Sequence, residues 1–325
     1  MKRVGILGLG EYLPQRILGN AELEKMVDTT DEWITSRTGI KERHLVSKLE
    51  AASDLAIKAA QEALKDAKIK AEDLELIIVA TITPDMQFPA TACFLQAGLN
   101  AKKAVCFDIS AACSGFIYGL DIARQFIARG SYKNALVVGT EVMSSVTDWQ
   151  DRGTCVLFGD GAGAAVLGEV KLGGILSTYL GSDGTKADLI KCPGGGSRFP
   201  ASSDTIKERL HYLKMEGNEV FKLAVNIMAN AASEAVKAAG LTLADIDLVV
   251  PHQANMRIIM ALGKKLNLPE KKIYLNIERC GNMSSASVAT ALCEAVKEGR
   301  VKKNDIILLD SFGAGLVWGA AIIKW

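Results

Sequence analysis

The sequence predicts an α/β protein made of two duplicated halves, in which helices cover sheets of mostly parallel strands. Three observations carry this prediction. A stretch of the first half recurs in the second, apolar strand-like runs alternate with amphipathic helical runs in both halves, and 325 residues exceed the usual size of one domain. We expect the boundary near residues 168–175, which gives halves at residues 1–171 and 172–325.

The repeat is a gap-free alignment of two segments. Residues 59–80, AAQEALKDAKIKAEDLELIIVA, match residues 231–252, AASEAVKAAGLTLADIDLVVPH, with eight identities and several exchanges between apolar residues. Self-similarity at a fixed offset indicates a duplicated unit. Nearly the same offset pairs residues 113–130 with residues 282–299, so each half is expected to place a strand, a turn and a helix in equivalent positions.

The first half begins with an apolar strand at residues 4–9, whose glycines have the wrong spacing for a dinucleotide fingerprint. A capping-box pattern at residues 29–32 then predicts a short helix that carries Trp33 and Arg37. Ser53 is expected to cap a longer helix, and residues 76–80 form the next strand.

The segment from Ala104 to Phe116 runs from an apolar strand through small residues into an amphipathic helix that ends at Gly130. Cys113 falls at the start of this helix, where free backbone N–H groups and the helix dipole favour a thiolate. Cys113 is therefore a candidate nucleophile, with a small packed core thiol as the alternative. Further on, the glycine-rich residues 158–163 predict a tight turn rather than a phosphate cradle, because no Lys-Ser/Thr follows them.

Two polar residues of the second half occupy informative positions. His252 follows an apolar strand at residues 248–251, at the strand end where ligands gather in α/β proteins. The other histidines are less informative: His44 lies in a charged stretch expected at the surface, and His211 has no evident partner. The repeat offset places Asn282 opposite Cys113, although a turn or a helix cap also explains an asparagine there.

Composition excludes several classes of protein. Lys and Arg balance Asp and Glu to a net charge of +1, which gives no reason to expect nucleic acid as a partner. The seven cysteines are scattered, which indicates neither a disulfide framework nor a zinc site and fits a reducing, cytoplasmic environment. The N-terminal apolar run is too short for a signal peptide, and no stretch predicts membrane insertion.

Cysteine, histidine and asparagine in this order also occur in papain-like proteases. The separation of 139 residues between Cys113 and His252 lies within the range of that family. Papain-like enzymes carry Cys-Gly-Ser-Cys-Trp around the nucleophile, however, whereas this duplicated chain has Ala-Ala-Cys-Ser-Gly. These differences argue against a protease.

Several short motifs, spread over nearly the whole chain, resemble those of one family. They are DTTDEWI at 28–34, RTGI at 37–40, AACSG at 111–115, DRGT at 151–154, FGDGAGA at 158–164, GNEVFK at 217–222, PHQAN at 251–255 and GN at 281–282. Together they resemble β-ketoacyl-[acyl carrier protein] synthase III, the initiating condensing enzyme of bacterial type II fatty-acid synthesis. The resemblance implies a thiolase-like fold, with the two halves packed as an α-β-α-β-α sandwich.

The resemblance also implies a catalytic triad of Cys113, His252 and Asn282. Elongating condensing enzymes use a second histidine where this chain has Asn282, and thiolases use a second cysteine in that role; we interpret the nearby Cys280 as structural. The oxyanion hole maps to the backbone N–H groups of Cys113 and Ala314. Family members often have glycine at the position of Ala314, so the pocket is expected to be slightly narrower here.

For a CoA thioester substrate, the resemblance implies Trp33 and Arg152 on either side of the adenine, with Arg37 near the phosphates. An arginine paired with a nearby acid is the alternative for Arg37, and a helix cap is the alternative for Asn218 in the pantetheine channel. The other implied CoA contacts are Thr29 and Phe221. No metal or redox cofactor is implied.

Two protein partners are implied as well. An acidic acyl carrier protein requires a basic face, which we expect on the helix after His252. Its contacts are expected at Lys222, Gln253, Ala254, Asn255, Met256, Arg257, Lys264 and Lys265. Phe88 resembles the residue that reaches across a homodimer interface to close the partner's acyl pocket, with a core phenylalanine as the alternative.

The implied reaction is a decarboxylative Claisen condensation. A short acyl-CoA, with acetyl-CoA as the first candidate, would combine with malonyl-[acyl carrier protein] through an acyl-cysteine to give a 3-oxoacyl-[acyl carrier protein], CoA and CO2. One alternative is a related synthase of secondary metabolism that makes another acyl product. A catalytically silent scaffold paralogue is the alternative from a different class, and the intact triad argues against it.

Overall fold

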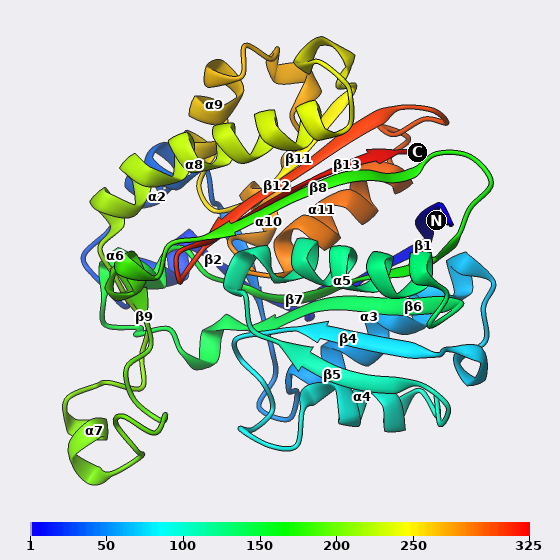
Figure 1. The fold of residues 1–325 in the computed structure, drawn as a ribbon. Coiled ribbons are helices and arrows are strands. Elements are labelled where there is room, and N and C mark those ends of the chain that lie inside the picture. The colour runs from blue at the N-terminus through cyan, green and yellow to red at the C-terminus, as the bar shows by residue number, and fades with distance from the viewer. Residues whose placement is uncertain (1) are drawn as a thin grey trace.

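Two sheets form the framework of the molecule, of which a computed structural model describes residues 2–325 (Figure 1). The first sheet has the strand order β1-β7-β6-β4-β5 and the second β11-β12-β13-β8. The strands of the first sheet are β1 (Val4–Tyr12), β4 (Leu76–Ala80), β5 (Val105–Ile109), β6 (Asn134–Val142) and β7 (Asp160–Glu169). Those of the second are β8 (Gly174–Ser182), β11 (Leu248–Pro251), β12 (Ile306–Gly313) and β13 (Val317–Lys324). The division at residues 171 and 172 stays a prediction.

Helices cover both sheets and fill the space between them, which confirms the predicted order α-β-α-β-α (Figure 1). The middle layer holds α5 (Gly115–Arg129) and α11 (Ala286–Lys297). The outer layers are α3 (Ala52–Ala67) with α4 (Thr91–Gly98), and α8 (Gly217–Ala238) with α9 (Met256–Lys265). No helix within residues 2–325 is long and apolar enough to cross a membrane.

Shorter elements lie in the connections. The remaining strands pair as β2 (Arg16–Gly19) with β3 (Glu42–Leu45) and β9 (Ile190–Lys191) with β10 (Lys214–Met215). The remaining α-helices are α1 (Asn20–Leu23), α2 (Asp31–Thr38), α6 (Arg152–Cys155), α7 (Ser203–Lys207) and α10 (Ile277–Cys280). The 3-10 helices are η1 (Ala71–Asp73), η2 (Ala112–Ser114), η3 (Met143–Ser145), η4 (Gly184–Leu189), η5 (Leu243–Asp245) and η6 (Glu270–Lys272).

The largest apolar core lies between the two sheets. Phe116 and Leu120 of α5 and Leu292 of α11 are fully buried there, against side chains from both sheets. Burying one such side chain contributes about 1.5–3 kcal/mol. The middle helices therefore hold the two sheets together, and the segments at their N-terminal ends are fixed by the same packing.

The structure confirms the duplication. In the first half η1 leads into β4, which pairs in parallel with β6, and β6 pairs with the antiparallel β7. In the second half η5 leads into β11, which pairs in parallel with β12, and β12 pairs with the antiparallel β13. The same order of a strand, a parallel neighbour and then an antiparallel strand therefore occurs twice.

The expectation of mostly parallel strands is wrong. In the two main sheets three neighbouring pairs are parallel and four are antiparallel. A parallel connection needs a crossover of a dozen or more residues, whereas only residues 314–316 join β12 to β13. The last strand of each half therefore turns back on its neighbour.

Two predicted helix caps also differ. Ser53 lies inside α3, and its hydroxyl donates to Asp85 at 2.6 Å, while the backbone N–H of Ala51 is bound by Asp54 at 2.9 Å. The helix α2 is capped by Thr30, whose Oγ1 accepts the N–H of Trp33 at 3.1 Å without a reciprocal box. The helices were predicted correctly and their first residues were not.

Candidate active site

One cavity of about 290 Å³ is lined by the side chains that could take part in a reaction. Cys113, His252 and Asn282 all line it, although they come from three separate segments of the two halves. Ala314 forms part of the same wall. The structure therefore brings together the three side chains that the sequence singled out.

Cys113 lies in η2, the short turn between β5 and α5. As predicted, α5 runs on to Gly130, whose left-handed φ of 86° ends it. The backbone of Cys113 is fixed from the second half, because Ser311 Oγ donates to its carbonyl oxygen at 2.8 Å. A Cβ at Gly313 would lie 2.7 Å from the Cys113 nitrogen, so only glycine fits this approach.

Burial opposes the expected thiolate. It raises the pKa of the Cys113 thiol to about 12, and the negative charge of Glu141 adds to the rise. The N-terminal end of α5 favours the thiolate, but this effect contributes only about 0.3–2 kcal/mol. In the unliganded protein the thiol is therefore neutral, contrary to the prediction from helix position alone.

His252 directly follows β11, as predicted. Its backbone N–H donates to the carbonyl oxygen of Asp310 at 2.7 Å, which anchors the residue to β12. The ring is 2% exposed, and Nδ1 has no hydrogen-bond partner within residues 2–325. Burial lowers the pKa of His252 to about 3, so the imidazole is neutral at physiological pH.

Asn282 is held by a turn rather than by a helix cap, since α11 begins only at Ala286. Its backbone N–H donates to the oxygen of Leu157 at 2.9 Å, and its oxygen accepts the N–H of Gly159 at 3.0 Å. The side-chain Oδ1 accepts the N–H of Ser284 at 2.9 Å. In the described chain Nδ2 makes no hydrogen bond, so this donor is free for a ligand in the cavity.

The glycine-rich residues 158–163 pack closely against the Asn282 segment. A Cβ at Gly159 would lie 2.5 Å from the Cys280 oxygen, and one at Gly163 would lie 2.4 Å from Ala289 Cβ. The close backbone packing is therefore confirmed, but the predicted tight turn is wrong, because residues 160–163 already belong to β7. Cys280 is fully buried, in accordance with a structural role.

The predicted oxyanion donors lie on the cavity wall. Ala314 belongs to the turn between β12 and β13, next to Gly313 and its close approach to Cys113. Within residues 2–325, neither the Cys113 N–H nor the Ala314 N–H donates to a turn or loop carbonyl. The two predicted donor residues therefore line the same cavity.

The predicted adenine site forms a cation–π cluster around Trp33. The guanidinium carbon of Arg152 lies 4.5 Å from the ring centroid, and that of Arg37 lies 5.9 Å from it. Arg152 also donates to the Asp28 oxygen at 2.7 Å, and it does not line the cavity. An adenine between Trp33 and Arg152 therefore requires Arg152 to move. Arg37 forms no ion pair within the described residues, so the acid-paired alternative is wrong.

Asn218, Phe221 and Thr29 have different environments. Asn218 and Phe221 line the cavity from α8. The cap alternative for Asn218 is wrong, because α8 begins at Gly217 and Asn218 makes no capping bond. Thr29 does not line the cavity, and its buried Oγ1 has no partner within residues 2–325.

The predicted carrier-protein face lies where α8 and α9 meet. Arg257 lines the cavity and stacks on Phe221 at 5.5 Å, while Lys222 pairs with Glu219 at 2.7 Å and Lys265 bonds Asn226. Asn255 caps α9 through the N–H of Arg257 at 2.8 Å. The other predicted residues differ in setting: Ala254 lines the cavity, Met256 packs beside Gly39, and Lys264 lies farther along α9.

Gln253 is a correction among the predicted carrier contacts. Its side chain is fully buried, and Nε2 donates to the oxygens of Pro251 and Tyr274 at 2.8 and 3.2 Å. Its Oε1 accepts the N–H groups of Asn276 and Ile277. Because both ends of the amide are used inside the protein, Gln253 supports the β11 end and has no surface for a partner.

Phe88 lies on the surface, with 82% of its area exposed, so the core alternative is wrong. The charged stretch around His44 also differs from expectation. Arg43 is fully buried and donates to the oxygens of Leu18 and Val156, and His44 is half-buried against the Pro14 oxygen. Charge alone was a poor guide there, because two backbone carbonyls and Asn20 Oδ1 accept hydrogen bonds from the terminal nitrogens of the buried guanidinium.

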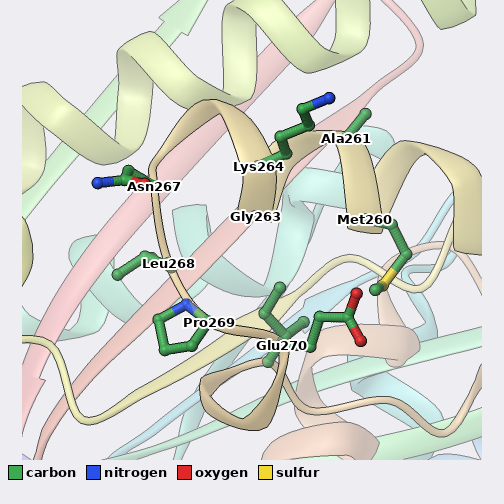
Figure 2. Close-up of a pocket in the computed structure, with 9 residues that line it drawn as sticks. Met260, Ala261, Gly263, Lys264, Asn267, Leu268, Pro269 and Glu270 are labelled. Carbon is green, nitrogen blue, oxygen red and sulfur yellow. The ribbon is translucent and has the colours of Figure 1, made fainter.

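A second and wider cavity, of about 690 Å³, lies at the far end of α9 (Figure 2). Met260, Ala261 and Lys264 line it from α9, and Leu268, Pro269 and Glu270 line it from the following loop. Its lining contains no cysteine, histidine or serine. The chemistry therefore lies in the smaller cavity.

Comparison with known proteins identifies the family. Residues 107–184 match the family model 3-oxoacyl-[acyl-carrier-protein (ACP)] synthase III, and residues 236–325 match its C-terminal model. A β-ketoacyl-[acyl-carrier-protein] synthase III of Caldanaerobacter subterraneus is 58% identical over 99% of this chain and 97% of its own length, and that of Clostridioides difficile is 55% identical over 99% and 98%. The chain belongs to the β-ketoacyl-[acyl carrier protein] synthase III family.

Solved structures agree with this assignment. The synthase III of Aquifex aeolicus has a TM-score of 0.93 at 48% identity and covers 99% of this chain and 100% of its own. A priming β-ketosynthase from the R1128 polyketide pathway also has a TM-score of 0.93, at 37% identity, and covers 99% and 97%. The predicted thiolase-like fold and condensing acyltransferase class are confirmed, and the protease alternative is wrong.

Sequence reasoning missed the apolar part of the synthase cavity. Ile82, Met143, Phe158, Leu213 and Met215 form one cluster along its wall. They come from four separate segments, because Leu213 and Met215 are only two residues apart, and only Phe158 lies in a motif that drew attention. Glu141 and Ser284 beside Cys113 were missed as well, although the motif with Asn282 runs directly into Ser284.

Proposed function

We propose that this synthase condenses a short acyl-CoA, acetyl-CoA first, with malonyl-[acyl carrier protein], giving a 3-oxoacyl-[acyl carrier protein], CoA and CO2. The observation that carries the proposal is one cavity holding a nucleophile, two neutral hydrogen-bond donors and an apolar wall. The reaction balances without a metal or redox cofactor. A cytoplasmic location is part of the proposal, because the thioester substrates are made there.

In the first half-reaction Cys113 attacks the acyl-CoA thioester. The tetrahedral oxyanion is stabilised by the N–H groups of Cys113 and Ala314, which lie on the cavity wall and are not used by turns or loops of the described chain. CoA leaves and the acyl group stays on the sulfur. The cluster around Met143 and Phe158 accepts the acyl chain, since its apolar lining disfavours charged or strongly polar groups.

In the second half-reaction His252 and Asn282 bind the thioester carbonyl of the malonyl group. Asn282 donates from Nδ2, which is free, and His252 donates from one ring nitrogen because its lowered pKa keeps it neutral. As CO2 departs, negative charge develops on the carbonyl oxygen between these donors. The resulting enolate attacks the acyl group on Cys113.

Recognition of the two substrates uses different surfaces. Trp33, Arg37 and Arg152 bind the adenine and phosphates of CoA, with Thr29 as a further CoA contact outside the cavity and Asn218 and Phe221 along the pantetheine path inside it. The carrier protein docks on the exposed basic side chains of Arg257 and Lys222, whose charge complements an acidic partner. We further propose a homodimer in which the exposed Phe88 closes the partner's acyl pocket.

Mass spectrometry tests the proposal. Incubation with acetyl-CoA should add an acetyl group to Cys113, and addition of malonyl-[acyl carrier protein] should remove it with formation of acetoacetyl-[acyl carrier protein]. The Cys113→Ala variant should show no adduct. Absence of an adduct on the wild-type protein, or an adduct that malonyl-[acyl carrier protein] does not discharge, would contradict the proposal.

The structural likeness to a polyketide priming ketosynthase supports one alternative, a synthase that starts another acyl product. The same assay separates the two. Several acyl-CoA primers compete in one reaction with the malonyl form of a fatty-acid carrier protein. Acetyl-CoA or another short acyl-CoA should be used in preference to the other primers. Preference for a different carrier protein favours the alternative.

A further inference from the structure

Ser284 lies beside the nucleophile with its hydroxyl uncommitted. It is fully buried, lines the same cavity as Cys113, and has a left-handed φ of 46° that is uncommon for serine. Its N–H binds Asn282 at 2.9 Å, but its Oγ has no well-formed hydrogen bond within residues 2–325. A buried hydroxyl without a partner is costly and calls for a function.

Two groups lie near this hydroxyl. One is the thiol of Cys113, which lines the same cavity, and the other is the carboxyl group of Glu141 near the end of β6, which accepts the N–H of the next residue, Ser285, at 3.4 Å. Glu141 is fully buried and accepts hydrogen bonds from Thr83 Oγ1 at 2.7 Å, from the Ile82 N–H at 3.1 Å and from the Ser285 N–H at 3.4 Å. These donors can hold a carboxylate at this depth, so Glu141 is able to carry the charge that Cys113 lacks.

The site has room for one negative charge. Burial raises the pKa of both Cys113 and Glu141, and the charge on Glu141 raises that of Cys113 further. Burial also disfavours the charged forms of His252 and Asp310, because it lowers the pKa of His252 and raises that of Asp310. A thiolate at Cys113 is therefore favoured when Glu141 becomes neutral in the same step.

We propose that Ser284 and Glu141 take up the thiol proton of Cys113. The Cys113 S–H proton passes to Ser284 Oγ while the Ser284 O–H proton passes to a Glu141 oxygen, leaving a thiolate and a neutral carboxylic acid. The thiolate forms the S–C bond, the C–S bond to CoA breaks, and the CoA thiolate takes the proton back through Ser284. Net charge is unchanged throughout, and Glu141 ends as a carboxylate.

The inference rests on the proposed acyl-cysteine mechanism. Its prediction for a neutral variant of Glu141 is opposite to the prediction that follows if Glu141 acts only as a fixed negative charge. If Glu141 acted only by its charge, its neutral amide variant would lower the Cys113 pKa and speed reaction of the thiol. If Glu141 receives the proton, the same variant slows that reaction, because the dry site then has no base.

The test uses Glu141→Gln, Ser284→Gly and Ser284→Ala, with Thr290→Ala as the matched control. Glycine suits the positive φ of Ser284 and alanine keeps the Cβ, so the pair separates loss of the hydroxyl from backbone fit. Thr290 is also fully buried, but it lies on α11 outside the cavity, and its hydroxyl donates to the Ala286 oxygen at 3.1 Å. Readouts are Cys113 alkylation by iodoacetamide against pH, CoA release from acetyl-CoA, and CO2 release from malonyl-[acyl carrier protein].

We expect Glu141→Gln and both Ser284 variants to slow alkylation and CoA release about 100-fold near neutral pH, with the loss shrinking as pH rises. CO2 release should change little in these variants, and Thr290→Ala should stay within a few-fold of wild type in all three readouts. Faster alkylation in Glu141→Gln, or a wild-type rate in Ser284→Gly, overturns the relay. Should Glu141→Gln not fold, Ser284→Gly decides alone. Failure of the wild type to form acyl-Cys113 contradicts the proposed function instead.

Discussion

Gly313→Ala is expected to impair acyl transfer by displacing the nucleophile. The new Cβ would lie 2.7 Å from the Cys113 nitrogen and 3.0 Å from its Cβ. Ordinary van der Waals contact begins at 3.4 Å, so the η2 turn or the β12 end must move by about 0.7 Å. Misplacement of reacting groups by about 1 Å costs about 100-fold in rate, and we expect a loss of about 10- to 100-fold here.

The assay is the rate of acetyl-Cys113 formation under single-turnover conditions, measured by quenched mass spectrometry. Overpacking also costs about 1–3 kcal/mol of stability, so urea denaturation should show a folded but destabilised protein. Ala314→Gly is the control, since it removes a methyl group from the adjacent residue without adding a contact. A folded Gly313→Ala protein that acylates at the wild-type rate would refute the reasoning.

Three further predictions concern His252, the CoA site and the carrier-protein face. The pKa of His252 is about 3 in the folded protein and about 6.5 in the unfolded chain, so between these pH values the unfolded chain binds one more proton. The free energy of unfolding therefore decreases as the pH is lowered through this range. Between pH 7 and pH 4, urea denaturation should show that the free energy of unfolding decreases by about 3 kcal/mol more in the wild type than in His252→Gln. Equal decreases in the two proteins would contradict this. Trp33→Ala should raise KM for acetyl-CoA but not for acetyl-pantetheine, and an equal rise for both excludes an adenine contact. Arg257→Glu should raise KM for malonyl-[acyl carrier protein] and spare acyl transfer from CoA, whereas the exposed Lys102→Glu should change neither, and equal losses in both half-reactions exclude a docking role.

The fold was predictable because the duplication constrained it. Two weak strand and helix patterns at one offset are stronger evidence than either alone, and the strands β4 and β11 lie at equivalent places. Strand direction was not predictable in the same way. Helix-rich connections suggested parallel sheets, but the short turn at residues 314–316, the pairing of β1 with β7 and the pairing of β8 with β13 depend on tertiary packing.

Within the site, residues that directly follow a strand were predictable, whereas a residue inside a strand was not. Cys113 and His252 follow apolar strands, so their positions could be inferred from the local pattern. Glu141 gave no such signal, because a carboxylate inside an apolar strand reads as a surface position. Its burial depends on donors from two other segments, Thr83 and Ser285.

The same low dielectric environment explains both halves of the proposed chemistry. A buried thiolate is unfavourable, so Cys113 is neutral at rest and needs a proton acceptor at the moment of attack. A buried imidazolium is equally unfavourable, so His252 is a donor without charge of its own. Negative charge then develops mainly on the substrate oxygen, between His252 and Asn282. Because water is excluded there, each hydrogen bond to this oxygen is stronger than it would be in water. A charged histidine in place of Asn282 would be destabilised by its removal from water, whereas the amide of Asn282 donates a hydrogen bond without carrying a charge.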